Sequence, residues 1–247
     1  MVRAVWDVDD DGERTGVLVV TLDRPDRRNA VDHATLLALT DAQVLAADAR
    51  VLVLTGEPPS FCAGADLTGV EEGEFATLLG KVLRGFTALP IPTVAAVDGA
   101  ALGAGTQLVV ACDLRVATPT SRFGIPAARL GLVVDHWTVE RLGREVGWSV
   151  ARAMLLGAET YDGATLHAAG AVHRLGPLDD ALAWAREIAV LAPLSIAAHK
   201  LTLERSAPEP AADDEVTEAR PRAWRRTDAS EGRAAFLAKR PPNFGGT

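Results

Sequence analysis

The stretch TVAAVDGAALGAGTQ, residues 93–107, decides the fold of this chain. Its first five residues are apolar or β-branched and follow the chain breakers Pro90 and Pro92, which predicts a buried strand. A glycine-rich turn follows over residues 99–105, and a helix is expected to begin near Ala104. A buried strand that leads through a small-residue turn into a helix is typical of an α/β protein.

The rest of the first half repeats this alternation of strands and helices. Asp32 is predicted to cap a helix that turns Leu36, Leu39 and Val44 toward the core. Compact apolar runs predict strands over residues 17–22, 51–54, 114–117 and 122–123. We therefore predict an α/β fold with a layered sheet in the first half of the chain.

From Thr138 onward the pattern becomes helical. Helices are predicted over residues 138–146, 149–156, 162–169 and 178–191, with one late strand over residues 171–175. A break rich in Pro and acidic residues, 206–214, precedes a charged amphipathic helical arm over residues 215–239. The expected division is a core over residues 1–190 and a helical C-terminal oligomerisation region over residues 191–247.

Composition narrows the class of protein. The 247 residues carry a net charge of −8, which argues against general affinity for nucleic acid or anionic membranes. No apolar run reaches the ~18 residues that a membrane span needs, and no signal sequence opens the chain. Cys62 and Cys112 lie in small or apolar surroundings, so we expect reduced thiols and a cytoplasmic location.

Two small-residue turns carry the chemical argument: residues 61–67 (FCAGADL) and 99–107 (GAALGAGTQ). A helix start presents unpaired N–H groups, and two such donors could polarise one carbonyl oxygen at roughly 3 kcal/mol each. The alternative is that Gly64, Gly103 and Gly105 only permit tight turns and close packing. The glycine spacing fits neither a dinucleotide fingerprint nor a phosphate loop, so hydride transfer and nucleotide hydrolysis have little support.

An ordered set of motifs adds a family resemblance. The motifs are LDRPDRRNAV (22–31), FCAGADL (61–67), residues 98–107, residues 112–115, FGIPAARLGL (123–132) and EGRAAFLAKRPPNF (231–244). Together they resemble the crotonase, or enoyl-CoA hydratase/isomerase, superfamily, including mycobacterial members that lack both catalytic glutamates. The resemblance implies an α/β fold with a crotonase-like ββα spiral core and a C-terminal helical trimerisation region.

The same resemblance implies the ligand and the assembly. Acyl-CoA or enoyl-CoA thioesters would be the ligands, with coenzyme A as part of the substrate and no metal or other cofactor. The chain would form a homotrimer or a hexamer. The segment 68–81 looks irregular and is expected to form part of the acyl pocket.

Site residues follow by position in the motifs. The resemblance assigns the oxyanion-hole N–H groups to Ala65 and Ala104, and the lining of the adenine and pantetheine site to Ala63, Asp66 and Leu67. Arg24 and Arg28 could meet coenzyme A phosphates, or could simply be solvated surface arginines. Phe236 and Lys239 would close over the coenzyme A of a neighbouring subunit, unless Phe236 only packs the arm.

Departures from the family pattern bear on mechanism. The two glutamates that position water in hydratases fall at Gln107 and Ala127, and Gln107 can orient a ligand but cannot shuttle a proton. Asp135 could serve as a base or a nucleophile, or could cap the helix that starts near Thr138. His136 and Trp137 would wall the acyl pocket.

These observations predict a protein that binds a fatty acyl-CoA or enoyl-CoA. If it is an enzyme, proton transfer or isomerisation through Asp135 is favoured over hydration, with hydrolysis as the next option. The competing interpretation is a non-catalytic acyl-CoA carrier or regulator in fatty-acid metabolism.

Overall fold

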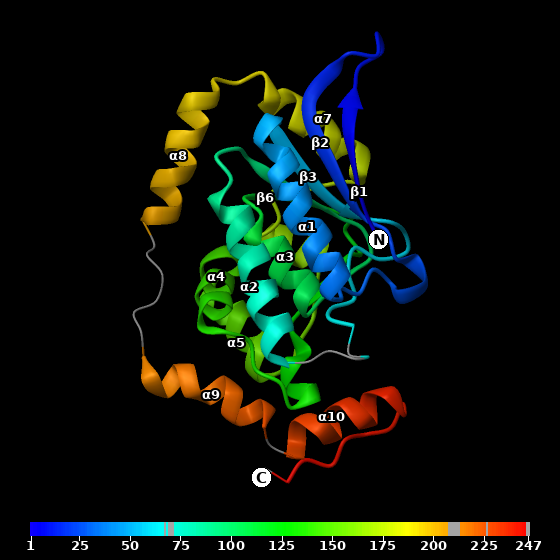
Figure 1. Ribbon diagram of the computed structural model, residues 1–247, viewed down its shortest axis with the longest axis vertical. Coiled ribbons are helices and arrows are strands. Elements are labelled where there is room, and N and C mark those ends of the chain that lie inside the picture. The colour runs from blue at the N-terminus through cyan, green and yellow to red at the C-terminus, as the bar shows by residue number, and fades with distance from the viewer. Residues whose placement is uncertain (67, 69–71, 207–212, 226, 246–247) are drawn as a thin grey trace. The chain divides into compact units, whose positions relative to one another are not determined.

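The computed structural model describes residues 1–66, 68, 72–206, 213–225 and 227–245 (Figure 1). The chain divides into two compact units, and each is described here by itself. The first unit comprises Met1–Phe123 and Tyr161–Pro208, and the second comprises Gly124–Thr160 and Glu209–Thr247. The division expected at residue 190 coincides with none of these breaks and stays a prediction.

A six-stranded sheet forms the centre of the first unit. Its order is β1 (Val2–Val8), β2 (Arg14–Leu22), β3 (Val51–Gly56), β4 (Thr93–Val97), β6 (Leu114–Ala117) and β9 (Arg174–Leu175). Only β1 and β2 pair in antiparallel fashion, and the other neighbours are parallel. The predicted α/β class and the predicted strands of the first half are confirmed, while β9 is shorter than the predicted 171–175.

A smaller sheet contains β5 (Ala100–Leu102), β7 (Arg122–Gly124) and β8 (Tyr161–Asp162). Phe123 pairs with Tyr161, and Arg122 donates its backbone N–H to Gly99 O at 3.0 Å. The β5 strand falls within the glycine-rich turn predicted over residues 99–105. Residues 100–102 of this turn are therefore part of a sheet.

Alternation along the parallel strands builds two buried faces. One face packs on α7 (Leu178–Ala189), whose Ala181, Ala185 and Ile188 meet valines of β2, β3, β4 and β6. Leu18, Leu52 and Leu54 point to the opposite face and are fully buried. Figure 1 shows three helices side by side in this unit: α1 (His33–Leu45), α2 (Glu72–Ala88) and α3 (Ala104–Ala111).

The first helix begins as predicted. Asp32 caps α1 by accepting the Thr35 N–H at 2.8 Å, and Leu36 and Leu39 are fully buried. The prediction for Val44 is wrong, because this side chain is 72% exposed. At 100° per residue, Val44 falls on the opposite side of the helix from Leu39 and Ala42.

The prediction of an irregular segment over residues 68–81 is also wrong where the structure describes it. Residues 72–81 belong to α2, a helix of 17 residues. Phe75, Leu79, Val82 and Phe86 recur at helical spacing on its buried face. Residues 67 and 69–71 lie outside the described part of the chain.

Later helices complete the first unit. The predicted helix over 162–169 is α6 (Gly163–Ala168), and the one over 178–191 is α7. The helix α8 (Pro193–Arg205), which lies in the region expected to be helical but was given no bounds of its own, carries Lys200, which is 7% exposed. The Lys200 ammonium donates to Phe86 O, Ile91 O and the Asp113 carboxylate at 3.0, 2.9 and 2.8 Å, so it ties α8 to the sheet.

The second unit is helical, as predicted for that part of the chain. It contains a 3-10 turn, η3 (Pro126–Leu130), and the helices α4 (His136–Val146), α5 (Trp148–Leu156), α9 (Asp214–Trp224) and α10 (Thr227–Leu237). The predicted arm over 215–239 is confirmed as two helices. Of the predicted break over 206–214, residues 207–212 lie outside the described residues.

No single helix within the described ranges has the length and apolar composition of a membrane span. The bent pair Leu178–Ala189 and Pro193–Arg205 passes such a test only when the two are taken together, with an angle of 110° between them.

Candidate functional site

The two predicted turns lie side by side in the first unit. Cys62 N–H donates to Ala100 O at 2.8 Å, and Leu102 N–H donates to Cys62 O at 2.9 Å. A Cβ on Gly105 would lie 2.3 Å from Cys62 O, so this position requires glycine for close packing. Main-chain contacts between residues 62 and 100–105 therefore fix the distance between the turns.

The N–H group of Ala65 is directed by its neighbours. Gly64 O accepts from Val31 N and Asp66 N donates to Val31 O, both at 2.8 Å, in a parallel bridge between Val31 and Ala65. In such a bridge the bonded groups belong to the residues that flank Ala65, so the N–H of Ala65 itself points away from Val31.

The second N–H group belongs to Ala104, the first residue of α3. Gly103 precedes it with φ of 54°, a value that favours glycine, and Gln107 N donates to Gly103 O at 3.1 Å. As the first helical residue, Ala104 has no acceptor within its own helix. A Cβ on Gly64 would lie 4.0 Å from Ala104 N, so the turn before Ala65 faces the start of this helix.

This arrangement has a specific chemical capacity. Two backbone N–H groups from neighbouring turns, one at a helix start, suit an oxygen that carries or develops negative charge. Alanine and glycine at 63–65 and 103–105 leave room for an oxygen to approach the backbone. The close-packing role of Gly105 and the donor role of Ala104 are therefore compatible.

Arg24 is tied into this region by ion pairs. Its Nη2 lies 3.0 Å from Asp32 Oδ2 and 3.2 Å from Asp66 Oδ2, and its Nη1 donates to Ala30 O. The side chains of Arg24 and Asp66 are only 20% and 10% exposed. Arg24 is thus a half-buried bridging residue, which differs from the solvated arginine considered above.

The two carboxylates beside Arg24 are stabilised in their charged forms. Burial acts to raise the pKa of Asp66, but hydrogen bonds from Thr68 and Arg24 outweigh it, and the pKa lies below its usual value. At Asp32 the same opposition holds between burial and the hydrogen bonds from Thr35, again with a lowered pKa. Both groups are anionic near neutral pH.

Arg28 presents the opposite picture to Arg24. It has φ of 51°, its side chain is exposed, and no carboxylate within the described ranges pairs with it. Its carbonyl oxygen accepts from Ala63 N at 3.0 Å, which places the residue beside the first turn. Leu67, the last residue predicted for this wall, lies outside the described residues.

Asn29 is a residue that the sequence reasoning missed. It is 1% exposed and has φ of 57°; its Nδ2 donates to Glu57 O at 2.7 Å and to Ser60 O at 2.6 Å. Its Oδ1 accepts from Arg24 N at 2.8 Å. The available signal was an asparagine in a turn, because this residue tolerates the left-handed region and bonds to nearby backbone.

In the second unit, Asp135 caps α4. Its Oδ1 accepts the Thr138 N–H at 3.1 Å, so the structural alternative for this residue is confirmed, and a catalytic role stays a prediction. His136 Nε2 lies 3.7 Å from Glu140 Oε1, and Trp137 is 6% exposed. Ala127 lies within η3.

The remaining predicted residues fall on two helices. Gln107 is buried in α3 at 6% exposure. Phe236 on α10 is 60% exposed, and Lys239 follows this helix with φ of 52° and donates its N–H to Phe236 O at 3.2 Å. An exposed Phe236 does not serve as a packing residue within its own unit, and closure over a neighbouring subunit's ligand stays a prediction.

Both thiols are free and fully buried. Burial raises the pKa of Cys62 and of Cys112 to about 12, so neither is a reactive thiolate. Across the described ranges, no group of three His, Cys, Asp or Glu side chains is arranged to hold a metal ion.

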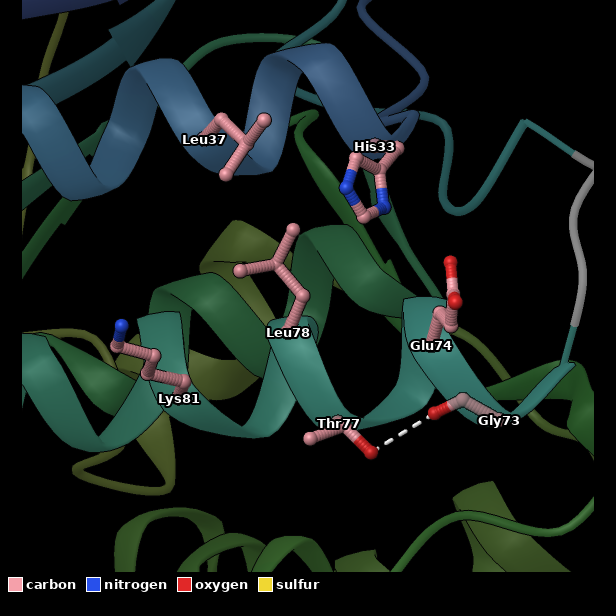
Figure 2. Close-up of a pocket in the computed structure, with 7 residues that line it drawn as sticks. All are labelled: His33, Leu37, Gly73, Glu74, Thr77, Leu78 and Lys81. Carbon is pink, nitrogen blue, oxygen red and sulfur yellow. Dashed lines mark hydrogen bonds between the residues drawn. The ribbon is translucent and has the colours of Figure 1, made fainter.

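A groove of about 600 Å³ runs between α1 and α2. Figure 2 shows Leu37 and Leu78 pointing toward each other across it, with His33 and Glu74 toward one end and Lys81 toward the other. Its α2 side belongs to the segment expected to contribute to the acyl pocket, and that assignment stays a prediction.

The fold and these turns define an α/β protein in which a parallel sheet holds two small-residue turns together. Comparison with known proteins gives the family. The family model for enoyl-CoA hydratase/isomerase matches residues 12–247. The chain therefore belongs to the enoyl-CoA hydratase/isomerase family.

Relatives span nearly the whole chain. A probable enoyl-CoA hydratase, echA6, of Mycobacterium bovis is 42% identical over 240 residues, covering 93% of this chain and 96% of that protein. The 2,3-dehydroadipyl-CoA hydratase of Escherichia coli is 36% identical over 250 residues, covering 93% and 95%. Among solved structures, a carnitinyl-CoA hydratase from Mycobacterium avium has a TM-score of 0.83 at 30% identity, covering 99% of this chain and 98% of that chain. The predicted crotonase-type fold is confirmed.

Proposed function

We propose that this protein binds an acyl-CoA or enoyl-CoA thioester, with the carbonyl oxygen between the N–H groups of Ala65 and Ala104. The observation that carries the proposal is the adjacency of the two turns: Ala65 directs its N–H away from Val31, and Ala104 opens α3. A polarised thioester carbonyl stabilises an enolate or a tetrahedral adduct.

Family membership supports the same class of ligand. The relatives named above are hydratases of coenzyme A thioesters. Arg28 supplies an exposed cation beside the first turn, suited to a phosphate through charge-assisted hydrogen bonds. Coenzyme A would enter as part of the substrate, without a metal or other cofactor.

For an enzymatic role we favour proton transfer or isomerisation by Asp135. Gln107 and Ala127 stand where the resemblance expects the two glutamates of a hydratase, and neither residue can shuttle a proton near neutral pH. Asp135 carries a carboxylate, the type of group that general acid–base catalysis uses, and it lies at the start of α4.

The second candidate is a non-catalytic acyl-CoA carrier or regulator. The specific observation that favours it is the cap itself, because Asp135 already has a structural reason to be present. The two candidates share the binding step and differ in whether the ligand is consumed.

One experiment separates these outcomes. The purified protein is incubated with short-chain and long-chain enoyl-CoA and dienoyl-CoA thioesters, with binding followed by calorimetry and products by mass spectrometry. An isomerised product supports the enzyme, a hydrated product overturns the inference from Gln107 and Ala127, and tight binding without product supports the carrier.

Asp135→Asn tests the role of the carboxyl group without removing the cap, because asparagine caps helices about as well as aspartate. Turnover is expected to fall by about 10²-fold or more while binding stays intact. Asp162→Asn is the matched control: Asp162 caps α6 by accepting the Thr165 N–H at 2.7 Å. Equal activity of Asp135→Asn and the wild type would remove the catalytic assignment.

A further inference from the structure

Arg24 lies after β2 and contacts both the start of α1 and the first turn. It follows β2 in the chain, and its guanidinium contacts Ala30 O, the carboxylate of Asp32 at the start of α1, and the carboxylate of Asp66 in the first turn. With 20% of its side chain exposed, it serves these contacts from a half-buried position.

The contacts of Arg24 involve the neighbours of the Val31 to Ala65 bridge, which sets the direction of the Ala65 N–H. Asp66 is held by its backbone N–H to Val31 O at 2.8 Å and by its carboxylate to Arg24 at 3.2 Å. The next residue after Val31 is Asp32, whose carboxylate also meets Arg24, at 3.0 Å. One cation therefore fixes both sides of the short Val31 to Ala65 bridge.

Thr68 completes the hold on the turn. Its backbone N–H donates to Asp66 Oδ1 at 3.2 Å and its hydroxyl donates to the same oxygen at 2.5 Å. Asp66 thus gives one carboxylate oxygen to its own turn and the other to Arg24. The carboxylate links the local turn to the start of α1 through the guanidinium.

Arg24 and Arg28 differ in the charge of their surroundings. Two carboxylates surround one guanidinium at Arg24, and these carboxylates are anionic because their pKa values are lowered. The net charge of this cluster is negative, which disfavours a phosphate. Arg28, on the same turn of chain, is exposed and has no such pair among the described residues.

We propose that Arg24 is a positioning residue: it holds the Ala65 N–H in line with the thioester carbonyl through Asp66 and Asp32, and does not bind a coenzyme A phosphate. This inference rests on the proposed function. It separates the two arginines of the LDRPDRR motif, leaving phosphate recognition to Arg28.

The test measures carbonyl polarisation and phosphate dependence separately. Crotonyl-CoA and crotonyl-pantetheine, each labelled with carbon-13 at the thioester carbonyl, are bound to the wild type, Arg24→Gln and Arg28→Gln. Infrared difference spectra give the carbonyl stretch of each bound probe, and calorimetry gives its affinity. Crotonyl-pantetheine carries no phosphate, so a phosphate-binding residue cannot affect it.

Arg24→Gln is expected to lose about half of the wild-type shift of the stretch to lower frequency, because one of two donors is misplaced. This loss should be the same with both probes, and affinity should fall by the same factor for both. Arg28→Gln is expected to weaken only crotonyl-CoA and to keep the full shift. An Arg24→Gln variant that keeps the shift and weakens only crotonyl-CoA would overturn the inference.

Three further variants serve as controls for the effect of Arg24→Gln on the carbonyl stretch. In Arg24→Gln/Asp66→Asn the loss of shift should not exceed that of Arg24→Gln alone, because both substitutions break one pathway. Arg24→Lys, which cannot reach both carboxylates in the same way, should give an intermediate shift and serves if the glutamine variant fails to fold. Arg27→Gln, an exposed arginine of the same 3-10 turn, should leave the stretch unchanged.

Failure of the proposed function has a different signature. A wild-type protein that binds neither probe, or binds without any shift of the carbonyl stretch, overturns the proposed oxyanion site and the role of Arg24 with it. A wild-type shift that survives Arg24→Gln overturns only the role of Arg24.

Discussion

The paired turns of the first unit and the loop before Asp135 in the second unit are held in different ways. Cys62 and residues 100–105 are linked by main-chain hydrogen bonds and by a glycine in direct contact with a carbonyl oxygen. The loop over residues 130–135 is held by the C-terminal helices: Gly232 packs on Leu130, and Arg220 Nε donates to Val133 O at 3.1 Å. Both regions use a glycine against a carbonyl oxygen, but the paired turns add main-chain hydrogen bonds, whereas the loop before Asp135 adds a side chain from the C-terminal helices.

The largest expected effect comes from breaking the backbone contact between the turns. Gly105→Ala would place a Cβ 2.3 Å from Cys62 O, an atom that cannot move because it accepts the Leu102 N–H. We expect the free energy of unfolding to fall by about 3 kcal/mol in urea denaturation, because overpacking of a fixed site is rarely relieved.

Gly73→Ala is the matched control for that substitution. A Cβ on Gly73 would meet nothing within 4 Å, and the residue lies in the first turn of α2. The variant should be as stable as the wild type or more stable by about 0.5 kcal/mol, since alanine favours the helix. A loss of less than about 1 kcal/mol in Gly105→Ala would show that the turns can separate at little cost.

A smaller effect is expected from the corresponding change in the second unit. Gly232→Ala would place a Cβ 2.3 Å from Leu130 O and push α10 away from η3, while alanine offsets part of this cost through helix propensity. We expect a net loss of about 1 to 2 kcal/mol. Hydrogen exchange should become faster at residues 130–135 and stay unchanged at Cys62 and Leu102. Equal acceleration in both units would contradict the inference that the two regions are held by independent contacts.

Much of the fold could be predicted because strands and caps are local signals. Residues 93–97 lie between prolines and a glycine turn, and Asp32 stands three residues before the Thr35 N–H that it accepts. The helix α2 was missed because Gly73, Gly80 and Gly85 weaken its propensity, and burial of Phe75 and Phe86 compensates only in the folded chain.

The candidate site divides along the same line. The two turns could be predicted from their small residues and from a helix start. The donors at Ala65 and Ala104 were assigned by the family resemblance, and this assignment stays a prediction. The ion pairs of Arg24 could not, because they join residues 24, 32 and 66, whose approach depends on the sheet register. A motif shows which residue types are present, but not which arginine meets a carboxylate.

Acid should affect the first unit through His173. This ring accepts the Arg115 N–H through Nδ1 at 3.1 Å, and burial, with the Arg115 charge, lowers the pKa of His173 from 6.5 to about 4. A protonated ring cannot accept this bond, so the folded state takes up the proton less readily than the unfolded state. The stabilisation is complete above pH 6.5 and is lost as the pH falls toward 4.

The expected loss is on the order of 1 kcal/mol, because the ring is partly exposed and solvent screens its charge. Urea denaturation at a series of pH values measures it. His173→Asn keeps an acceptor but does not titrate, so its unfolding free energy should vary less between pH 4 and 6.5. A wild type and variant with identical pH dependence would rule out His173 as the responsible group.

The smallest effect on stability is expected at the end of the chain, where the contact between Glu231 and Arg240 persists to low pH. Glu231 accepts from both Nη atoms of Arg240, at 2.6 and 2.7 Å, and from Asn243 N at 2.8 Å, and these bonds lower the pKa of Glu231 from 4.5 to about 2. Because the folded pKa is the lower one, this contact stabilises the chain end above pH 4.5 and is lost only as the pH falls toward 2. The carboxyl carbon-13 shift of Glu231, followed by NMR, should titrate near 2 in the wild type and return toward 4.5 in Arg240→Gln, with little change in overall stability because the pair is solvent-exposed. A Glu231 titration near 4.5 in the wild type would mean that the chain end is not held on α10 in solution. A Glu231 titration near 2 would mean that α10 keeps this contact at pH values where His173 has already been protonated.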